Sequence, residues 1–273
     1  MMRLGFIGGG QMAEAMIRGL GAHAAAFDIH IIVFDVSAER CDYLRKSYPL
    51  TVARSLDEVM QSCDRVVLAV KPQVYPAVAE AVAAGYREGQ ILLSIMAGLA
   101  LDTLCEKLPA TAKCVRLMPN LAMAVGQGAC LYCDRNLEEN ERADTIALLE
   151  TIAAVWPLAE KQINGASAIS GSGPALFYTM LEGLTLGGIA VGLPKDAALA
   201  MANQTMLGTA LLLRESDAHP AALRDSVLSP GGTTIAAVEV LENAGFRGDL
   251  IRAVRAASDR ADALGGQKGG ATK

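Results

Sequence analysis

Residues 3–13, RLGFIGGGQMA, run from a short apolar stretch through three glycines into an amphipathic segment over residues 12–20. Gly8, Gly10 and Ala13 match the G-x-G-x-x-A pattern that joins a strand to a helix in dinucleotide-binding folds. Gly8 permits the tight turn, Gly10 lets the backbone approach a pyrophosphate, and Ala13 lets the helix pack closely on the strand. A turn needed only for chain reversal explains one or two glycines, but not the small residue at position 13. The stretch therefore predicts a strand, turn and helix that bind a dinucleotide.

Short β-branched runs alternate with amphipathic stretches as far as about residue 158, which is typical of successive βα units that build a parallel sheet. The predicted strands are residues 3–8, 29–35, 65–70, 90–94, 113–118 and 128–133, with a last one near 155–158. The predicted helices between them are residues 12–20, 38–47, 74–84, 102–107 and 138–152.

Beyond residue 163 the strand pattern disappears, and we predict helices over residues 174–191, 196–213, 221–227, 235–243 and 250–264. Two of these are apolar nearly all round, and a domain of this size has little interior to cover them, so we expect an intimate homodimer. The predicted fold class is α/β, with an N-terminal Rossmann-like, mostly parallel sheet and a C-terminal all-α dimerisation domain. We expect a dinucleotide-binding domain over residues 1–160, a helical substrate and dimerisation domain over residues 161–264, and a disordered tail over residues 265–273.

The composition is that of a packed globular protein, with 52% hydrophobic and 19% charged residues. A net charge of −5 argues against a nucleic-acid partner, which needs clustered Lys and Arg. The most apolar segment, residues 173–193, contains Glu182 and several glycines, which favours a buried helix over a membrane span. We therefore expect a small-molecule ligand, with no nucleic acid and no membrane as partner.

The six cysteines lack the spacing of a disulfide framework, and the N-terminus shows no signal peptide, so we expect a cytoplasmic protein. Cys130 and Cys133 form the only close pair. They lie on a predicted strand, where an odd offset sends their side chains to opposite faces. No metal site is predicted.

The second predicted strand ends within residues 31–40, IIVFDVSAER. Asp35 lies where an acidic residue bonds a ribose 2′-hydroxyl and favours NAD, whereas Ser37 and Arg40 are suited to a 2′-phosphate. Each also has a plain structural explanation, Asp35 as a turn residue and Arg40 as part of a solvated helix face. These residues leave the choice between NADPH and NADH open.

Three further segments follow predicted strands, at the edge where open α/β sheets bind ligands: AVKPQ (69–73), SIMAG (94–98) and RLMPN (116–120). Taken alone, each has a structural explanation: Lys71 as the end of a strand, Gly98 as part of a turn and Asn120 as a partner of loop backbone. The occurrence of all three favours a ligand-binding edge. The predicted cofactor contacts are Gly8, Gly9, Gly10, Gln11, Met12, Asp35, Ser37, Arg40, Val70, Lys71, Pro72, Ala97, Gly98 and Asn120.

The segment LSPGGTT (228–234) leads into the predicted helix over residues 235–243. Its glycines let backbone amides converge on an anion at the helix start. The alternative is that Thr233 or Thr234 is only a helix N-cap. A similar turn, SGSGP (170–174), puts Pro174 at a position suited to the first helical turn.

Together the motifs FIGGGQMAEA, AVKPQ, SIMAGL, RLMPN, SGSGPA and SPGGTT resemble, in this order, those of the pyrroline-5-carboxylate reductase family. The resemblance spans nearly the whole chain, and SPGGTT is far more specific than the first motif. Leu228 and Ser226 depart from the residues more frequent in the family, Thr and Asn.

The resemblance implies reduction of L-1-pyrroline-5-carboxylate to L-proline by NADPH, with NADH as the alternative, in dimers that can assemble further into a ring. It implies that Gly231, Gly232, Thr233 and Thr234 hold the substrate carboxylate, and that Thr234 is the catalytic residue that contacts or helps to protonate the ring nitrogen. Glu160 corresponds to a position near the substrate; otherwise it is an acidic residue at a surface turn.

Two rival functions stay open. A β-hydroxyacid dehydrogenase also joins a Rossmann domain to a helical one, but it needs a catalytic lysine in a glycine-rich setting, which Lys161 and Lys195 lack. A non-catalytic dinucleotide-binding protein needs no substrate motif, and the intact SPGGTT segment counts against it.

Overall fold

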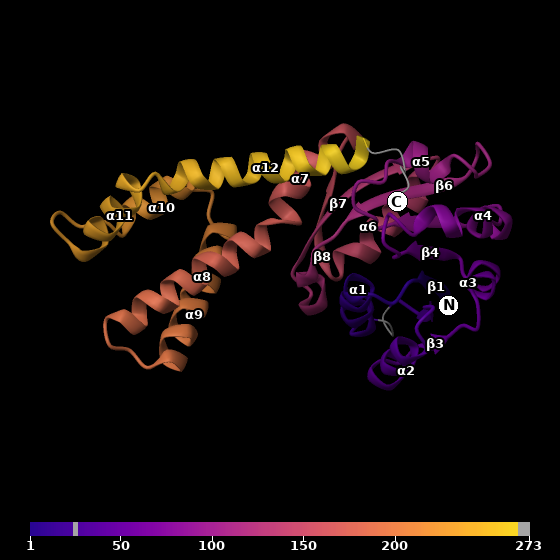
Figure 1. Ribbon diagram of the computed structural model, residues 1–273, viewed down its shortest axis with the longest axis horizontal. Coiled ribbons are helices and arrows are strands. Elements are labelled where there is room, and N and C mark those ends of the chain that lie inside the picture. The colour runs from indigo at the N-terminus through magenta and orange to yellow at the C-terminus, as the bar shows by residue number, and fades with distance from the viewer. Residues whose placement is uncertain (24–26, 267–273) are drawn as a thin grey trace, which may run out of the picture. The chain divides into compact units, whose positions relative to one another are not determined.

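The computed structural model describes residues 1–23 and 27–266 and divides into two compact units (Figure 1). The first unit comprises residues 1–171 together with the described chain from Ala257 onward. The second comprises residues 172–256.

The first unit is built on one eight-stranded sheet in the order β3-β2-β1-β4-β5-β6-β7-β8. The strands are β1 (Met2–Ile7), β2 (Ile29–Phe34), β3 (Thr51–Val52), β4 (Arg65–Leu68), β5 (Ile91–Ser94), β6 (Lys113–Met118), β7 (Gly128–Arg135) and β8 (Ala153–Pro157). Every neighbouring pair is parallel except β6 and β7. The order reverses direction between β1 and β4, which is the switch point where Rossmann folds bind dinucleotides.

The connecting helices are α1 (Gln11–Gly21), α2 (Ala38–Ser47), α3 (Leu56–Ser62), α4 (Tyr75–Gly85), α5 (Leu101–Cys105), the 3₁₀ helix η1 (Leu121–Val125), α6 (Glu139–Glu150) and α7 (Glu160–Ser170). They confirm the predicted α/β class and the mostly parallel sheet. The expectation of parallel βα units is wrong at one connection, because β7 returns antiparallel to β6 after η1. Glu160, for which a surface turn was the alternative to a position near the substrate, is the first residue of α7.

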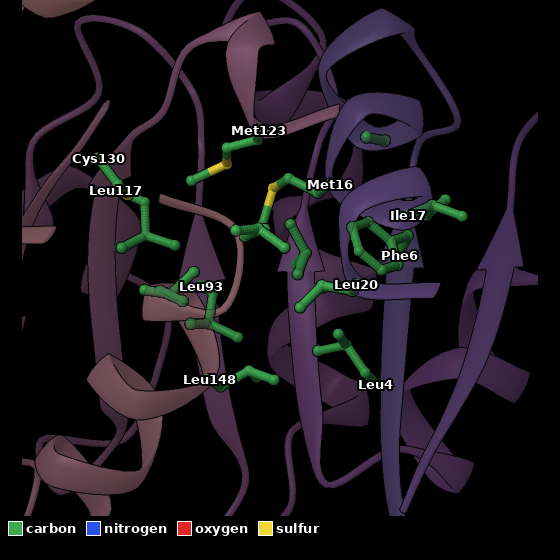
Figure 2. Close-up of a cluster of buried hydrophobic side chains, with 14 of the residues drawn as sticks. Leu4, Phe6, Met16, Ile17, Leu20, Leu93, Leu117, Met123, Cys130 and Leu148 are labelled. Atoms are coloured by element: carbon green, nitrogen blue, oxygen red, sulfur yellow. The ribbon is translucent and has the colours of Figure 1, made fainter. Parts of the chain in front are cut away.

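Apolar side chains form one core on each face of the sheet. On β1, Leu4 and Phe6 belong to the core that α1 covers with Met16 and Leu20, and Figure 2 shows these side chains packed together. Ile7 points to the opposite core. Successive side chains of a strand point to opposite faces of the sheet, so the short apolar strand β1 contributes to both cores. Along β7, Cys130 and Cys133 also belong to opposite cores, as predicted.

The second unit is helical, as predicted, with α8 (Gly173–Ala190), α9 (Lys195–Arg214), α10 (Pro220–Ser226), α11 (Thr233–Asn243) and the first part of α12 (Phe246–Gly266). Many of its large apolar side chains are exposed, among them Leu184, Leu186 and Leu212. No helix in the described part of the chain is long and apolar enough to cross a membrane. The disordered tail predicted for residues 265–273 lies outside the described residues, except for residues 265 and 266, which end α12.

Candidate functional site

The glycine turn between β1 and α1 has the geometry of a phosphate-binding turn. Gly8 has a φ of +100°, and a Cβ there would lie 2.7 Å from the carbonyl oxygen of Ala69 at the end of β4. Gly10 is the N-cap of α1, and a Cβ there would meet no described atom within 4 Å. Gly8 is therefore required by the fold, whereas Gly10 leaves open the space beside the first amides of α1, where a diphosphate binds. Gln11 and Met12 are the first two residues of that helix.

Asp35, directly after β2, holds the glycine turn. Its Oδ2 accepts a hydrogen bond from the Gly9 amide at 2.7 Å, and its Oδ1 accepts one from the Ser37 amide at 2.8 Å. Ser37 in turn caps α2, since its hydroxyl accepts from the Arg40 amide. Asp35, predicted to bond a ribose hydroxyl, thus lies beside the glycine turn and already carries two backbone hydrogen bonds.

Arg40 also turns toward the glycines. Its Nε donates to the carbonyl oxygen of Gly9, and its guanidinium forms an ion pair with Glu14 of α1. Arg40, predicted as a cofactor contact suited to a 2′-phosphate, lies beside the glycine turn, but its pairing with Glu14 was not foreseen. The alternative of a wholly solvated helix face is wrong, because only 26% of the Arg40 side chain is exposed.

The other predicted cofactor contacts follow β4, β5 and β6, which are adjacent parallel strands. Val70, Lys71 and Pro72 follow β4, and Ala97 and Gly98 follow β5. Because parallel strands end at the same edge of the sheet, these segments share the edge that carries the glycine turn. Lys71 is exposed there, and Gly98 has the positive φ of +74° of a tight turn.

Asn120, after β6, uses its side chain to join backbone segments. Its Nδ2 donates to the carbonyl oxygen of Ser170 at 2.9 Å, and its Oδ1 accepts from the Ala129 amide at 3.1 Å. Asn120 therefore satisfies backbone groups, as its structural explanation required, but those of a helix and a strand instead of a loop. Its amide ties the start of β7 to the end of α7.

Arg116, within the RLMPN motif on β6, is a buried charge that the sequence reasoning did not single out. Its side chain is 4% exposed and lies 3.2 Å from Oε1 of Glu160, and its Nη2 donates to Oδ1 of Asn164 at 2.8 Å. The same Glu160 oxygen accepts from the Leu101 amide at 2.6 Å. Among the described residues, Nε of Arg116 has no partner. A lone arginine in the apolar strand KCVRLM was the signal available in the sequence.

The SPGGTT segment lies in the second unit, at the start of α11. Gly231 has a φ of +66°, which favours glycine, whereas Gly232 has a φ of −78° and a Cβ there would meet the Ser229 hydroxyl, which can rotate away. Gly232 is the N-cap, and Thr233 and Thr234 are the first two helical residues, both exposed. The alternative that either threonine is the N-cap is wrong. The first amides of α11 have no intrahelical acceptor, which leaves them available to an anion.

A glycine turn at the switch point of a parallel sheet, followed by an all-helical part, places the chain in the class of Rossmann-type dinucleotide-binding proteins. Residues 3–98 match the family model described as NADP oxidoreductase, coenzyme F420-dependent. Residues 160–264 match the family model described as pyrroline-5-carboxylate reductase dimerisation. No three His, Cys, Asp or Glu side chains gather to hold a metal ion in residues 1–23 and 27–266.

The full chain is similar to named relatives over nearly its whole length. It is 40% identical to pyrroline-5-carboxylate reductase of Synechocystis sp., with 97% of this chain and 98% of the relative covered. It is 39% identical to that of Glycine max, with 96% and 95% covered. The crystal structure of the Plasmodium falciparum enzyme with NADP bound superposes with a TM-score of 0.87 at 30% identity, covering 97% of this chain and 98% of that one. The chain belongs to the pyrroline-5-carboxylate reductase family.

Proposed function

We propose that this chain reduces L-1-pyrroline-5-carboxylate to L-proline with NADPH as hydride source, NADH being the alternative. The observation that carries the proposal is the presence of two glycine-containing turns in one chain of this family. One is the glycine turn, open at Gly10, and the other is the SPGGTT turn with free amides at the start of α11. The first suits a diphosphate and the second suits a carboxylate.

The cofactor side comprises the glycine turn and the shared sheet edge. The amides of Gly10, Gln11 and Met12 would hold the diphosphate beside Gly9, whose own amide already donates to Asp35, and Asp35 and Ser37 would face the adenosine ribose. The segments after β4, β5 and β6, with Val70, Lys71, Pro72, Ala97, Gly98 and Asn120, would flank the rest of the dinucleotide. The open space at Gly10 fits such a ligand. When bound, NADPH supplies the hydride.

The substrate side comprises the amides and hydroxyls around Gly231, Gly232, Thr233 and Thr234. They would hold the ring carboxylate, because unpaired amides and the positive end of a helix dipole favour an anion. Glu160 would stand near the substrate, although its Oε1 is already engaged by Arg116 and Leu101.

Reduction places a hydride on the imine carbon and a proton on the ring nitrogen. A protonated imine accepts hydride far better than a neutral one, so the protein need only bind the iminium and orient it. Thr234 is proposed to contact the ring nitrogen or help to protonate it. This chemistry requires neither a metal ion nor a covalent nucleophile.

We further propose that residues 161–264 form a homodimer, with a ring of dimers as a higher assembly, in the cytoplasm. The exposed apolar side chains of α8 and α9 support a partner chain, because an isolated soluble protein rarely leaves so many uncovered. The reduced state of all six cysteines is compatible with a reducing compartment.

A coupled assay tests the function. Purified full-length protein is mixed with L-1-pyrroline-5-carboxylate and NADPH, or NADH, and the nicotinamide absorbance is followed while proline is measured by mass spectrometry. The proposal expects oxidation of the cofactor and an equal amount of proline. No oxidation with either cofactor would rule the function out.

A further inference from the structure

The Arg40 guanidinium joins α1 and α2 around the glycine turn. Through Nε it donates to the Gly9 carbonyl, and through Nη2 it pairs with Oε2 of Glu14. Its Cζ also lies 5.0 Å from the ring centroid of Tyr43. The side chains of Arg40 and Glu14 are only 26% and 20% exposed, so this pair is partly shielded from solvent. Arg40 is thus committed to protein partners beside the proposed ribose site.

Glu14 is itself held in place from the other side. Its Oε1 accepts hydrogen bonds from the hydroxyls of Tyr43 at 3.0 Å and Tyr48 at 2.8 Å. Burial alone would raise the pKa of Glu14, but the hydrogen bonds from Arg40, Tyr48 and Tyr43 outweigh it and keep the pKa below its usual value. Glu14 therefore carries its negative charge at neutral pH and balances the charge of Arg40.

We propose that Glu14 limits the affinity of this chain for the 2′-phosphate of NADPH by holding Arg40 in this ion pair, an inference that rests on the proposed function. A free guanidinium binds a phosphate through two parallel hydrogen bonds. In this structure one edge of the guanidinium is taken by Glu14 and the Gly9 carbonyl, and the carboxylates of Glu14 and Asp35 repel a phosphate dianion. Glu14 is thus a specificity-determining residue that acts through Arg40.

Glu14→Gln separates the charge of Glu14 from its shape, since glutamine keeps the size and can still accept from the two tyrosines. Removing the charge frees Arg40 for a phosphate while leaving an unphosphorylated ribose unaffected. Glu39→Gln is the matched control, because Glu39 precedes Arg40 on α2 and its loss changes the net charge by the same amount. Arg40→Gln, alone and combined with Glu14→Gln, tests whether the effect passes through Arg40.

The experiment is calorimetric titration of the full chain with adenosine 2′,5′-bisphosphate and with adenosine 5′-monophosphate, which differ only in the 2′-phosphate. Glu14→Gln should tighten binding of the bisphosphate about fivefold or more, as expected for release of a partly buried ion pair, and change that of the monophosphate less than about twofold. Glu39→Gln should change neither the bisphosphate affinity nor the monophosphate affinity by more than about twofold. In the Arg40→Gln background, Glu14→Gln should no longer tighten binding of the bisphosphate.

An unchanged or weaker affinity of Glu14→Gln for the bisphosphate overturns the inference, as does an equal gain in Glu39→Gln. Thermal unfolding of each variant verifies that it is folded. Suppose that the wild-type protein oxidises NADPH with pyrroline-5-carboxylate, but Glu14→Gln leaves the ratio of the bisphosphate affinity to the monophosphate affinity unchanged. Only this inference then fails. If wild type binds neither nucleotide and oxidises neither cofactor, the proposed function fails with it.

Discussion

Gly8 and Gly10 stand two residues apart in one turn, yet different physical constraints act on them. Gly8 has a backbone conformation that L-residues rarely adopt and lies against the Ala69 carbonyl. Gly10 has a φ of −64°, which any residue tolerates, and faces open space. The first glycine therefore serves the fold, and the second is proposed to serve the ligand.

Substitution by alanine should separate these two roles. Gly8→Ala is expected to lower the free energy of unfolding by about 1–3 kcal/mol or more, because it adds strain and a clash. Gly10→Ala should lower it by less than about 1 kcal/mol but weaken NADPH binding at least about tenfold. Urea unfolding and fluorescence titration with NADPH measure the two effects. Equal losses of stability in both variants would contradict this assignment.

Thr234 is the residue proposed to contact the substrate's ring nitrogen. Thr234→Ala should lower kcat at least about tenfold while the Kd for NADPH stays within about twofold, because the proposed contact is with the substrate. Thr111→Ala, which removes an exposed threonine just before β6, is the control and should leave both unchanged. Wild-type turnover in Thr234→Ala would place this residue outside the chemistry.

Spacing and residue type were sufficient to predict the position of single residues, but not the partners of long side chains. The spacing of Gly8, Gly10 and Ala13 is set by the geometry of a strand that turns into a helix. The turn could therefore be identified from the sequence alone. The ion pair of Arg40 with Glu14 and the burial of Arg116 join residues distant in sequence. Such contacts depend on how helices pack across the sheet, which no local pattern encodes.

Helix α7 is attached to the sheet by a small polar network. Glu160 at its first turn accepts from Leu101 and Arg116, and Asn164 one turn later accepts from Arg116. Arg116 is almost fully buried, so its charge depends on these partners.

Glu160→Ala should therefore lower the free energy of unfolding by about 1–3 kcal/mol, since it leaves a buried amide and a buried guanidinium short of an acceptor. Glu150→Ala, at an exposed position near the end of α6, is the control and should be nearly neutral. Urea denaturation compares them. If Glu160→Ala is as stable as Glu150→Ala, the network does not anchor α7. The KM for substrate, measured in parallel, tests the separate proposal that Glu160 lies near the substrate.

The sequence patterns did not predict β3, α3, η1 or α7, and of these only α7, with eleven residues, is long enough to show a helical period. β3 has two residues and α3 seven, too few to show a period, although Ser55 and Glu58 at the start of α3 form a recognisable capping pattern. The antiparallel return of β7 follows from length, because only residues 119–127 separate β6 from β7 and a parallel crossover needs a dozen or so residues. Alternation of strands and helices predicted the rest of the sheet correctly.

For the whole molecule, the exposed apolar helices predict that the second unit needs a partner chain. The side chain of Leu212 on α9 is 60% exposed. Leu212→Glu should give a monomer in light scattering and a low turnover in the activity assay, because a charge cannot be buried in an apolar interface. Val36→Glu, at a position 95% exposed in the first unit, should keep the wild-type assembly. An active monomer of the wild-type protein at high dilution would contradict the homodimer.

The most direct test of the substrate site is a crystal structure of the full chain with NADP⁺ and proline bound together. The account predicts the proline carboxylate within hydrogen-bonding distance of the Thr233 and Thr234 amides, with the diphosphate against Gly9 and Gly10. Proline bound away from the start of α11, or a diphosphate away from the glycine turn, would contradict it.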